Sequence, residues 1–294
     1  MWQCPLCHLA LNTEDTSWRC ANNHTFDRAK SGYVNLLPVQ QKKSKHPGDD
    51  KAMLNARRAF HDSHGYLPLM QAVARQLENL FVQHNKPIRY SVEPPAAPLI
   101  LYDAGCGEGA YLKFVADALA VAGYSVVASG SDIAKQAVEM ASKSFPSAQF
   151  VVASSVSLPV MDEQLDVIMQ IFAPGKDDEY ARVLRPRGLL VTVDPGPDHL
   201  WQLKQKVYQR PQQHQQKSSQ KAGFELLETC RETFELVFSS DTQRQALYAM
   251  TPYVWRLNEE HRVELDHLAE VTADFTVRFW RKLAGDRPGG QYEQ

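Results

Sequence analysis

The chain has 294 residues, of which 44% are hydrophobic and 22% are charged, and these ordinary globular fractions exclude a wholly disordered protein. No stretch approaches the roughly 20 consecutive apolar residues of a membrane-spanning helix, and the first residues lack the pattern of a secretory leader. We therefore expect a soluble, cytoplasmic protein without membrane contacts. The net charge is −2, yet residues 28–58 carry about +6 and the remainder about −8. The basic stretch is either a docking surface for phosphates or a solubilising loop.

Composition divides the chain into four parts. Residues 1–37 are turn-rich and bear cysteine and histidine, and we predict a small metal-binding module there. Residues 38–98 are predicted to hold a basic arm, an amphipathic helix and a proline-rich linker. Residues 99–283 alternate strand and helix patterns, and residues 284–294 are expected to form a disordered tail.

Three of the five cysteines fall within the first 20 residues, in the pattern Cys4-x-x-Cys7 followed by Cys20-x-x-x-His24. Clustered cysteines in a cytosolic protein indicate a metal site, and three sulfurs with one nitrogen close a tetrahedron that suits one structural zinc ion. His8 follows Cys7 directly, so its side chain should diverge from the same metal, and we prefer His24. The alternatives are a metal-free cluster and a redox Cys-x-x-Cys, although the thioredoxin-like context of a redox pair is missing.

The second part begins with basic and polar residues up to position 65, including a turn signal at 46–49. From 67 to 83, apolar residues recur at steps of three and four, which predicts an amphipathic helix. Prolines at 87, 94, 95 and 98 then exclude regular structure from the linker.

The third part predicts a parallel sheet covered by helices on both faces, because strands and helices alternate. The predicted strands are residues 99–102, 125–128, 149–152, 165–171 and 189–193, and the helices lie around 112–119, 134–141 and 176–184. Residues 209–221 are rich in glutamine, and we expect a mobile surface loop there. Two further strands are expected at 224–238 and 273–280, with helical material between them.

A glycine-rich run, Asp103-Ala104-Gly105-Cys106-Gly107-Glu108-Gly109, directly follows the first predicted strand of this sheet. Its glycines permit a tight turn against which a ligand can press without meeting a Cβ atom. Dinucleotide-binding enzymes share this feature, so that alone it is a weak signal. The acid at its start, Asp103, can face the cationic methionine end of S-adenosylmethionine, which favours this cofactor over a nicotinamide.

Two further positions support adenosylmethionine. Asp132 ends the second predicted strand, where its carboxylate can accept from both ribose hydroxyls, although it can also cap the next helix. Residues 153–155 follow the third strand and are placed to border the adenine.

The order of these parts resembles the bacterial 23S ribosomal RNA (guanine-N1)-methyltransferases. The resemblance runs from about residue 2 to about residue 282. It rests on the Cys4…His24 module, on residues 32–38, 47–49, 56–60 and 103–109, and on Ala173-Pro174 and Pro195-Gly196-Pro197. One departure is Arg187, which occupies a position before the fifth strand where methyltransferases often have glycine. The loop 171–174 also lacks the Asn/Asp-Pro-Pro-Tyr signature of many amino-group methyltransferases.

The resemblance implies a Rossmann-like class I adenosylmethionine-dependent methyltransferase fold with a small N-terminal zinc domain that recognises RNA. The implied reaction is methylation of N1 of a guanine in a hairpin loop of 23S rRNA by a homodimer. The family's cofactor contacts match Gly107, Glu108, Tyr66 and His199. With the residues argued above, the candidate cofactor set is Tyr66, Asp103, Gly105, Gly107, Glu108, Asp132 and His199.

Two roles stay open at this level. Asp194 and His199 lie near the expected reaction site, but neither is assigned as a catalytic base, and Phe172, Tyr66 or Trp201 is a candidate for stacking on the guanine. For RNA docking, the basic arm offers phosphate contacts from Lys42, Lys43, Lys45, Arg57 and Arg58. The alternative functions are a small-molecule methyltransferase and a non-catalytic RNA-binding protein that keeps the fold as a platform.

Overall fold

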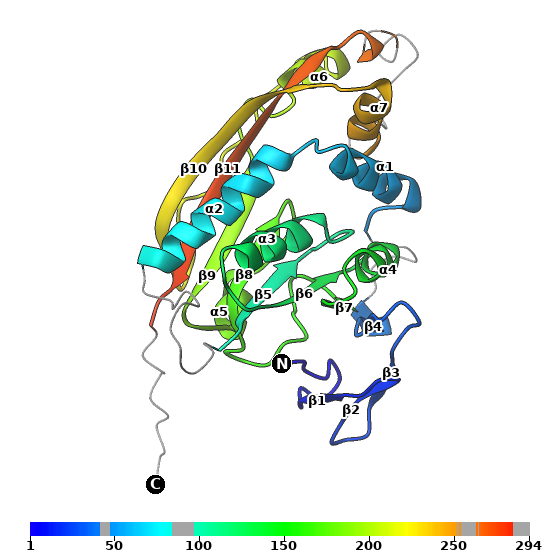
Figure 1. The fold of residues 1–294 in the computed structure, drawn as a ribbon, viewed down its shortest axis with the longest axis vertical. Helices are drawn as coiled ribbons and strands as arrows, with labels where there is room; N and C mark the ends of the chain where they lie inside the picture. Colours follow the sequence, from blue (N-terminus) through cyan, green and yellow to red (C-terminus); the bar gives the residue numbers. More distant parts are fainter. Residues whose placement is uncertain (42–47, 84–96, 252, 254–262, 264, 285–294) are drawn as a thin grey trace.

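The computed structural model describes residues 1–41, 48–83, 97–251, 253, 263 and 265–284, including all the strands discussed below. Lys42, Lys43, Lys45, most of the linker and the tail lie outside these described residues. An eight-stranded sheet runs through the molecule, and a three-stranded sheet near the N-terminus lies beside it (Figure 1). No helix in the described parts of the chain combines the length and apolarity needed to cross a bilayer.

The large sheet has the order β10-β11-β9-β8-β5-β6-β7-β4. Its strands are β4 (Val34–Asn35), β5 (Leu99–Ala104), β6 (Val126–Asp132), β7 (Gln149–Val152), β8 (Leu165–Ile171), β9 (Leu184–Pro195), β10 (Phe224–Val237) and β11 (Glu270–Lys282). The strands from β4 to β9 pair in parallel, while β11 pairs antiparallel with both β9 and β10. Parallel pairing brings the carboxyl ends of the central strands to one edge, where open sheets bind ligands.

The large sheet has a hydrophobic core on each face, because successive side chains of a buried strand point to opposite faces. One face contributes Leu101, Val167, Met169, Leu189 and Val191 to a core with three helices: α2 (Leu67–Gln83), α3 (Ala110–Val121) and α4 (Lys135–Ser144). The other face contributes Tyr102, Ile168 and Leu190 to a core with the N-terminal residues and α5 (Asp177–Val183). The N-terminal module thus covers part of a sheet face.

The N-terminal module has its own small sheet, made of β1 (Leu11–Thr13), β2 (Ser17–Cys20) and β3 (Thr25–Asp27). Trp2 anchors it to the large sheet: its ring centroid lies 5.3 Å from that of Trp18 and 6.2 Å from that of Tyr102, and its Nε1 donates to Gln149. Residues 34 and 35 pair with 151 and 152, so that the chain leaving the module becomes an edge strand of the large sheet.

The structure contains the expected strands and helices, with several bounds extended by a few residues. It adds two helices that the sequence did not predict, at residues 51–62 and 201–207. The first, α1 (Lys51–Asp62), begins after Asp50, whose side chain accepts from the N–H of Met53. Only Leu54 and Phe60 of α1 are fully buried, too few to form a clear apolar stripe. Two short helices, α6 (Trp201–Val207) and α7 (Asp241–Ala249), and a 3₁₀ turn at Val39–Gln41 complete the described elements. Residues 209–221 contain neither helix nor strand.

Candidate cofactor site and metal centre

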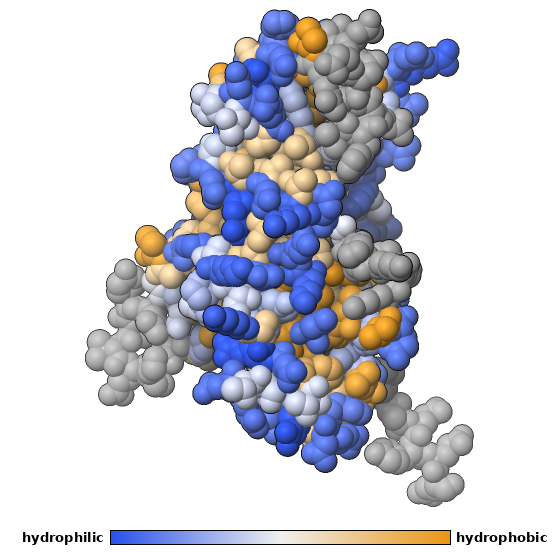
Figure 2. Space-filling model, turned by 90° about the vertical axis from the view of Figure 1, so that its right-hand side faces the viewer, coloured by the Kyte–Doolittle hydropathy of each residue, from blue (hydrophilic) through white to orange (hydrophobic). Residues whose placement is uncertain are grey.

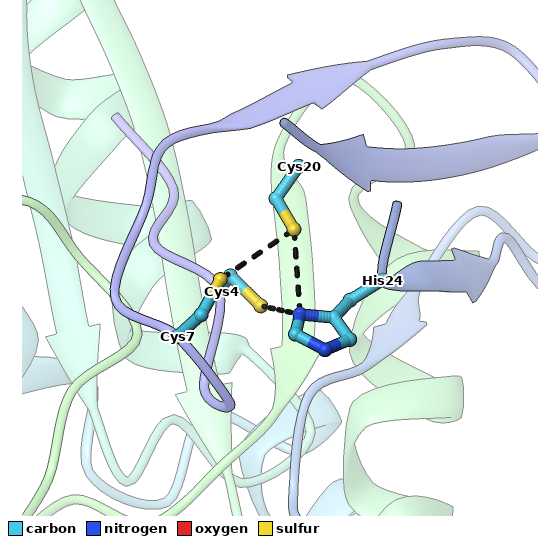
Figure 3. Close-up of side chains that lie close together, drawn as sticks. All are labelled: Cys4, Cys7, Cys20 and His24. Carbon is cyan, nitrogen blue, oxygen red and sulfur yellow. Dashed lines mark hydrogen bonds between the residues drawn. The ribbon is translucent and has the colours of Figure 1, made fainter. Parts of the chain in front are cut away.

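Cys4, Cys7, Cys20 and His24 converge between the first turn of the chain and the β2–β3 connection (Figure 3). Sγ of Cys4 and Sγ of Cys20 each lie 3.5 Å from Nδ1 of His24, and the Sγ atoms of Cys7 and Cys20 are 3.6 Å apart. All four ligand atoms lie within 4.8 Å of one another. Around a zinc ion with Zn–S bonds of about 2.3 Å, ligand atoms of a regular tetrahedron are about 3.8 Å apart. The donor set and its spacing fit one structural zinc ion.

Two tight turns create this geometry. The N–H of His8 donates to the carbonyl of Cys4, and the N–H of Asn23 donates to that of Cys20, so each turn brings two ligands together. His8 and Asn23 both have positive φ, at 61° and 60°. His24 contributes the nitrogen atom of this cluster, and His8 lies outside it.

The glycine-rich run forms the turn between β5 and α3, and its three glycines all have positive φ. Gly105, at φ +90°, lies so close to Ala173 that an added Cβ would come within 2.4 Å of the alanine Cβ. The turn therefore requires glycine at this position both for its backbone conformation and for its close approach to the β8–α5 loop.

All seven candidate cofactor residues line one cavity of about 620 Å³ at the carboxyl ends of the parallel strands. This size lies within the usual range for small-molecule sites. Ser154 and Ser155, predicted to border the adenine, line the same cavity, as does Phe172 of the β8–α5 loop. Although Phe172 is not glycine, it has φ +55°, and its side chain is 43% exposed. An exposed aromatic held in this backbone conformation is a candidate contact for a planar ligand.

Asp103, the first residue of the glycine-rich run, is buried, and its Oδ1 atom has no hydrogen-bond partner among the described residues. Burial, followed by the nearby carboxylates of Asp132 and Glu108, raises the pKa of Asp103 to about 8. A buried carboxyl without a partner carries a free-energy penalty that a cationic ligand would remove. Asp103 is therefore suited to the positively charged methionine end of adenosylmethionine.

Asp132 holds the loop conformation as well as facing the cavity. Its Oδ2 accepts from the N–H of Gly107 at 3.0 Å, and its Oδ1 accepts from the N–H of Ala134 at 2.8 Å. A carboxylate has about four acceptor positions, so each oxygen keeps one for a ribose hydroxyl. The capping bond and the ribose contact considered for Asp132 are thus compatible.

Helix α1 supplies a wall of the cavity that the sequence analysis missed. Nδ1 of His61 lies 2.5 Å from Oε1 of Glu108, and Nη2 of Arg57 lies 2.5 Å from Oδ2 of Asp49. All four residues line the cavity. No local motif marked His61, whereas Asp49 belongs to the segment 47–49 quoted for the family resemblance, although no role at the cavity was predicted for it. The structure places Arg57, expected on an RNA-docking surface, at the cofactor cavity.

Tyr66 and His199 meet in the cavity, although 133 positions separate them. The hydroxyl of Tyr66 lies 3.5 Å from Nε2 of His199, while Nδ1 of His199 accepts from the N–H of Asp274 at 3.3 Å. Burial, followed by the neighbouring His214 and Lys204, lowers the pKa of His199 to about 3, although Asp274 opposes this effect. The ring is therefore neutral at pH 7, and its Nε2 carries the hydrogen.

Three other charged residues near the site, Asp194, Asp198 and Arg58, have partners within the protein. Asp194 pairs with Lys217 at 2.5 Å, and Asp198 pairs with Arg231 at 2.8 Å. Nη2 of Arg58 donates to the carbonyl of Met140 at 3.0 Å. Trp201 begins α6 and is not among the residues lining the cavity. Of the three aromatic residues named as candidates for stacking on the guanine, only Phe172 and Tyr66 line the cavity.

Comparison with known proteins agrees with this two-part organisation. The family model described as "RlmA, N-terminal", a zinc ribbon, matches residues 2–45, and the model described as "Methyltransferase domain" matches residues 101–188. The 23S rRNA (guanine(748)-N(1))-methyltransferase of Streptomyces fradiae is 34% identical over 202 residues, which cover 68% of this chain and 65% of that protein.

Two further relatives carry the provisional name 23S rRNA (guanine-N1)-methyltransferase. The relative from Micromonospora griseorubida is 34% identical over 206 residues, or 68% of each chain. The relative from Bacillus subtilis (strain 168) is 29% identical over 286 residues, or 94% of each chain. The similarity therefore extends through both the zinc ribbon and the methyltransferase domain.

Proposed function

Because this chain belongs to the 23S rRNA (guanine-N1)-methyltransferase family, we propose that it methylates N1 of a guanine in a hairpin loop of 23S rRNA. The observation that carries the proposal is a combination of two features in one chain. A Cys3His module of the RlmA type precedes a sheet whose cavity gathers Asp103, Asp132 and the glycine-rich run. A small-molecule methyltransferase has no need of the first feature.

Adenosylmethionine supplies the methyl group on a sulfonium centre. In this proposal, Asp103 balances the positive charge of the methionine end, and Asp132 accepts from the ribose hydroxyls. Tyr66, Glu108 and His199 complete the binding wall. The protein's main contribution is to hold the two reactants in line, and such positioning is worth about 7–11 kcal/mol in favourable cases.

The acceptor guanine must reach the cavity out of its RNA stack. A hairpin-loop base is unstacked more cheaply than a base in a duplex, and proteins stabilise extruded bases by aromatic stacking. Phe172 is suited to this role because it is 43% exposed, lines the cavity, and rests on Phe275 with ring centroids 5.5 Å apart.

We assign RNA docking to the zinc module and the basic arm, in keeping with the division of the chain that the sequence predicts. Lys42, Lys43 and Lys45 are the foremost phosphate contacts, because Arg57 and Arg58 already have partners within the protein. The surface near α1 and α4 is largely hydrophilic, with smaller hydrophobic patches, which is compatible with a polar nucleic acid (Figure 2). The proposed substrate implies a cytoplasmic protein, and the family resemblance implies a homodimer, which sedimentation equilibrium tests.

The function is tested by mapping methylated guanines in 23S rRNA from cells with and without the gene. The expected result is one N1-methylguanine that depends on the gene and is restored in vitro by the purified protein and adenosylmethionine. Methylation of a metabolite pool without any change in the rRNA would instead support a small-molecule enzyme. Absence of adenosylmethionine binding in calorimetry would support a non-catalytic RNA-binding protein.

A further inference from the structure

The glutamine-rich segment between α6 and β10 is fastened across the carboxyl end of β9. The N–H of His214 donates to the carbonyl of Pro197 at 3.2 Å, and the side chain of Gln213 donates to Asp198 at 2.7 Å. Further along, Oγ1 of Thr276 donates to Gln216, and Lys217 pairs with Asp194. The segment therefore contacts both the loop after β9 and strand β11, and it holds His214 in a defined position.

His214 lines the same cavity as the candidate cofactor residues, and its ring centroid lies 6.1 Å from that of His199. The Nε2 atom of His214 is buried and has no hydrogen-bond partner among the described residues. Such an atom needs an explanation, because buried polar groups are normally paired. A ligand that donates a hydrogen to Nε2 would supply the missing partner.

The reaction needs such an acceptor, since N1 of guanine carries a hydrogen at neutral pH. His199 cannot take it, because its Nδ1 already accepts from Asp274 and its Nε2 therefore carries a hydrogen. The carboxylates of Asp194, Asp198 and Glu108 are engaged by Lys217, Arg231 and His61. Asp103 and Asp132 serve the cofactor. Tyr111 keeps its proton, because burial raises the pKa of its hydroxyl well above the ordinary value.

We propose that Nε2 of His214 is the general base that accepts the N1 proton of the target guanine. The N1–H electron pair becomes available as the proton moves to Nε2. N1 forms the new bond to the methyl carbon, and the carbon–sulfur bond breaks with its electron pair kept by sulfur. The products are N1-methylguanine, the neutral thioether and a His214 imidazolium, which returns its proton to water. This assignment rests on the proposed function.

The charges around His214 suit a base that is neutral before the reaction. Burial, followed by the ammonium of Lys204 on α6, lowers the pKa of His214, while Asp274 on β11 opposes this effect. His199 is neutral, and the carboxylate of Asp198 is paired with Arg231. His214 is therefore unprotonated at pH 7, and Asp274 remains nearby to stabilise the imidazolium once it forms.

The experiment compares the wild type with His214→Gln, His214→Ala and a matched control in the same segment, Gln215→Ala, whose side chain is exposed. The substrate is 23S rRNA from cells that lack the gene. Single-turnover methyl transfer is measured from pH 6 to 9.5, and the affinities for adenosylmethionine and for rRNA are measured separately. General bases contribute about 10²–10⁴-fold, so we expect the His214 variants to lose at least about 100-fold in rate at pH 7 with both affinities nearly unchanged.

The pH profile distinguishes the loss of a general base from a structural disturbance of the site. Without a base, the rate should rise about tenfold per pH unit as N1 ionises by itself, so the deficit should shrink at high pH. Added imidazole should partly restore His214→Ala, and Gln215→Ala should match the wild type. Unchanged rates at pH 7, or a loss that neither high pH nor imidazole relieves, would overturn the assignment of His214 alone. A wild-type protein that does not methylate rRNA would overturn the proposed function, and the base with it.

Discussion

Glu108 of the glycine-rich run and His61 of α1 are hydrogen-bonded to each other, with Oε1 and Nδ1 2.5 Å apart and both side chains almost fully buried. The pair fastens α1 onto the turn that begins α3. It also separates the cofactor cavity from a second cavity of about 600 Å³, because both residues line both cavities. A helix from the basic arm thus becomes part of the cofactor site through one buried contact.

Because of this pair, the free energy of unfolding should decrease as the pH becomes acidic. Burial by itself raises the pKa of Glu108, but the hydrogen bond and charge of His61, with the charge of Arg57, outweigh it and leave the pKa below its usual value. A lowered carboxyl pKa contributes stability that is present above the unfolded value of about 4.3 and is lost as the pH falls through the folded value. His61→Ala should therefore reduce the free energy of unfolding at pH 7 by about 3 kcal/mol.

Urea unfolding between pH 3 and 7 checks this effect. His64→Asn is the matched control, because His64 is an exposed histidine just after the same helix, and asparagine tolerates its positive φ. Equal losses in the two variants would contradict a specific role for the His61–Glu108 pair.

Adenosylmethionine binding should release a proton from Asp103. With a pKa raised to about 8, this carboxyl is largely protonated at pH 7 in the free protein, and a cationic ligand favours its ionised form. Affinity should therefore increase with pH up to about 8. In the free protein the same raised pKa costs stability as the pH rises from the unfolded value of about 3.9, because the folded state binds the proton more tightly.

Calorimetry at pH 7 in phosphate and in Tris measures this proton, since the two buffers differ in ionisation enthalpy. Asp103→Asn should bind more weakly and with the same enthalpy in both buffers. An identical wild-type enthalpy in the two buffers would show that Asp103 does not change its protonation on binding.

Asp132 should contribute directly to cofactor affinity. Two charge-assisted bonds to the ribose diol predict that Asp132→Ala weakens adenosylmethionine binding by about 1.5–3 kcal/mol, or roughly 10- to 150-fold. Asp132→Asn keeps an acceptor for one backbone N–H and should lose less. Asp117→Ala, which changes an exposed aspartate on α3, is the control for calorimetry. An unchanged affinity in Asp132→Ala would remove this residue from the site.

The Cys3His cluster predicts about one zinc ion per purified chain. Cys20→Ser should lose the metal and expose Trp2, whose fluorescence should shift to longer wavelength, while the methyltransferase domain keeps its own core and still binds adenosylmethionine. His8→Asn is the matched control, because His8 lies next to Cys7 but outside the cluster. Elemental analysis that finds no zinc in freshly purified wild type would refute the metal assignment.

The basic arm should dominate the salt dependence of RNA binding. Each phosphate contact contributes roughly 0.7–0.9 to the log–log slope, so replacing Lys42, Lys43 and Lys45 with alanine should flatten the slope by about two to three units. The KM for rRNA should rise, while the affinity for adenosylmethionine should not change. Binding measured across a salt series checks this, and an unchanged slope would mean that the arm is only a solubilising loop.

Local patterns predicted most of the elements. The helix at 67–83 and the strands at 149–152 and 165–171 have the predicted bounds, because the spacing of apolar residues reflects which face each element buries. Helix α1 escaped prediction because it buries little apolar surface. Its position depends on contacts with α4 and α7, which are far away in the sequence.

The sequence alone identified the Cys3His cluster and the glycine-rich turn, because each consists of residues close together in the chain whose chemistry requires that spacing. Only the tertiary structure decided which distant residues complete the cavity. His61, His199 and His214 come from a helix and two loops, and they meet because parallel pairing brings the carboxyl ends of several strands to one edge. The sequence around His214 is rich in glutamine and gives no sign of a functional role. Its position in the wall of the cavity, which only the tertiary structure shows, suggests that role.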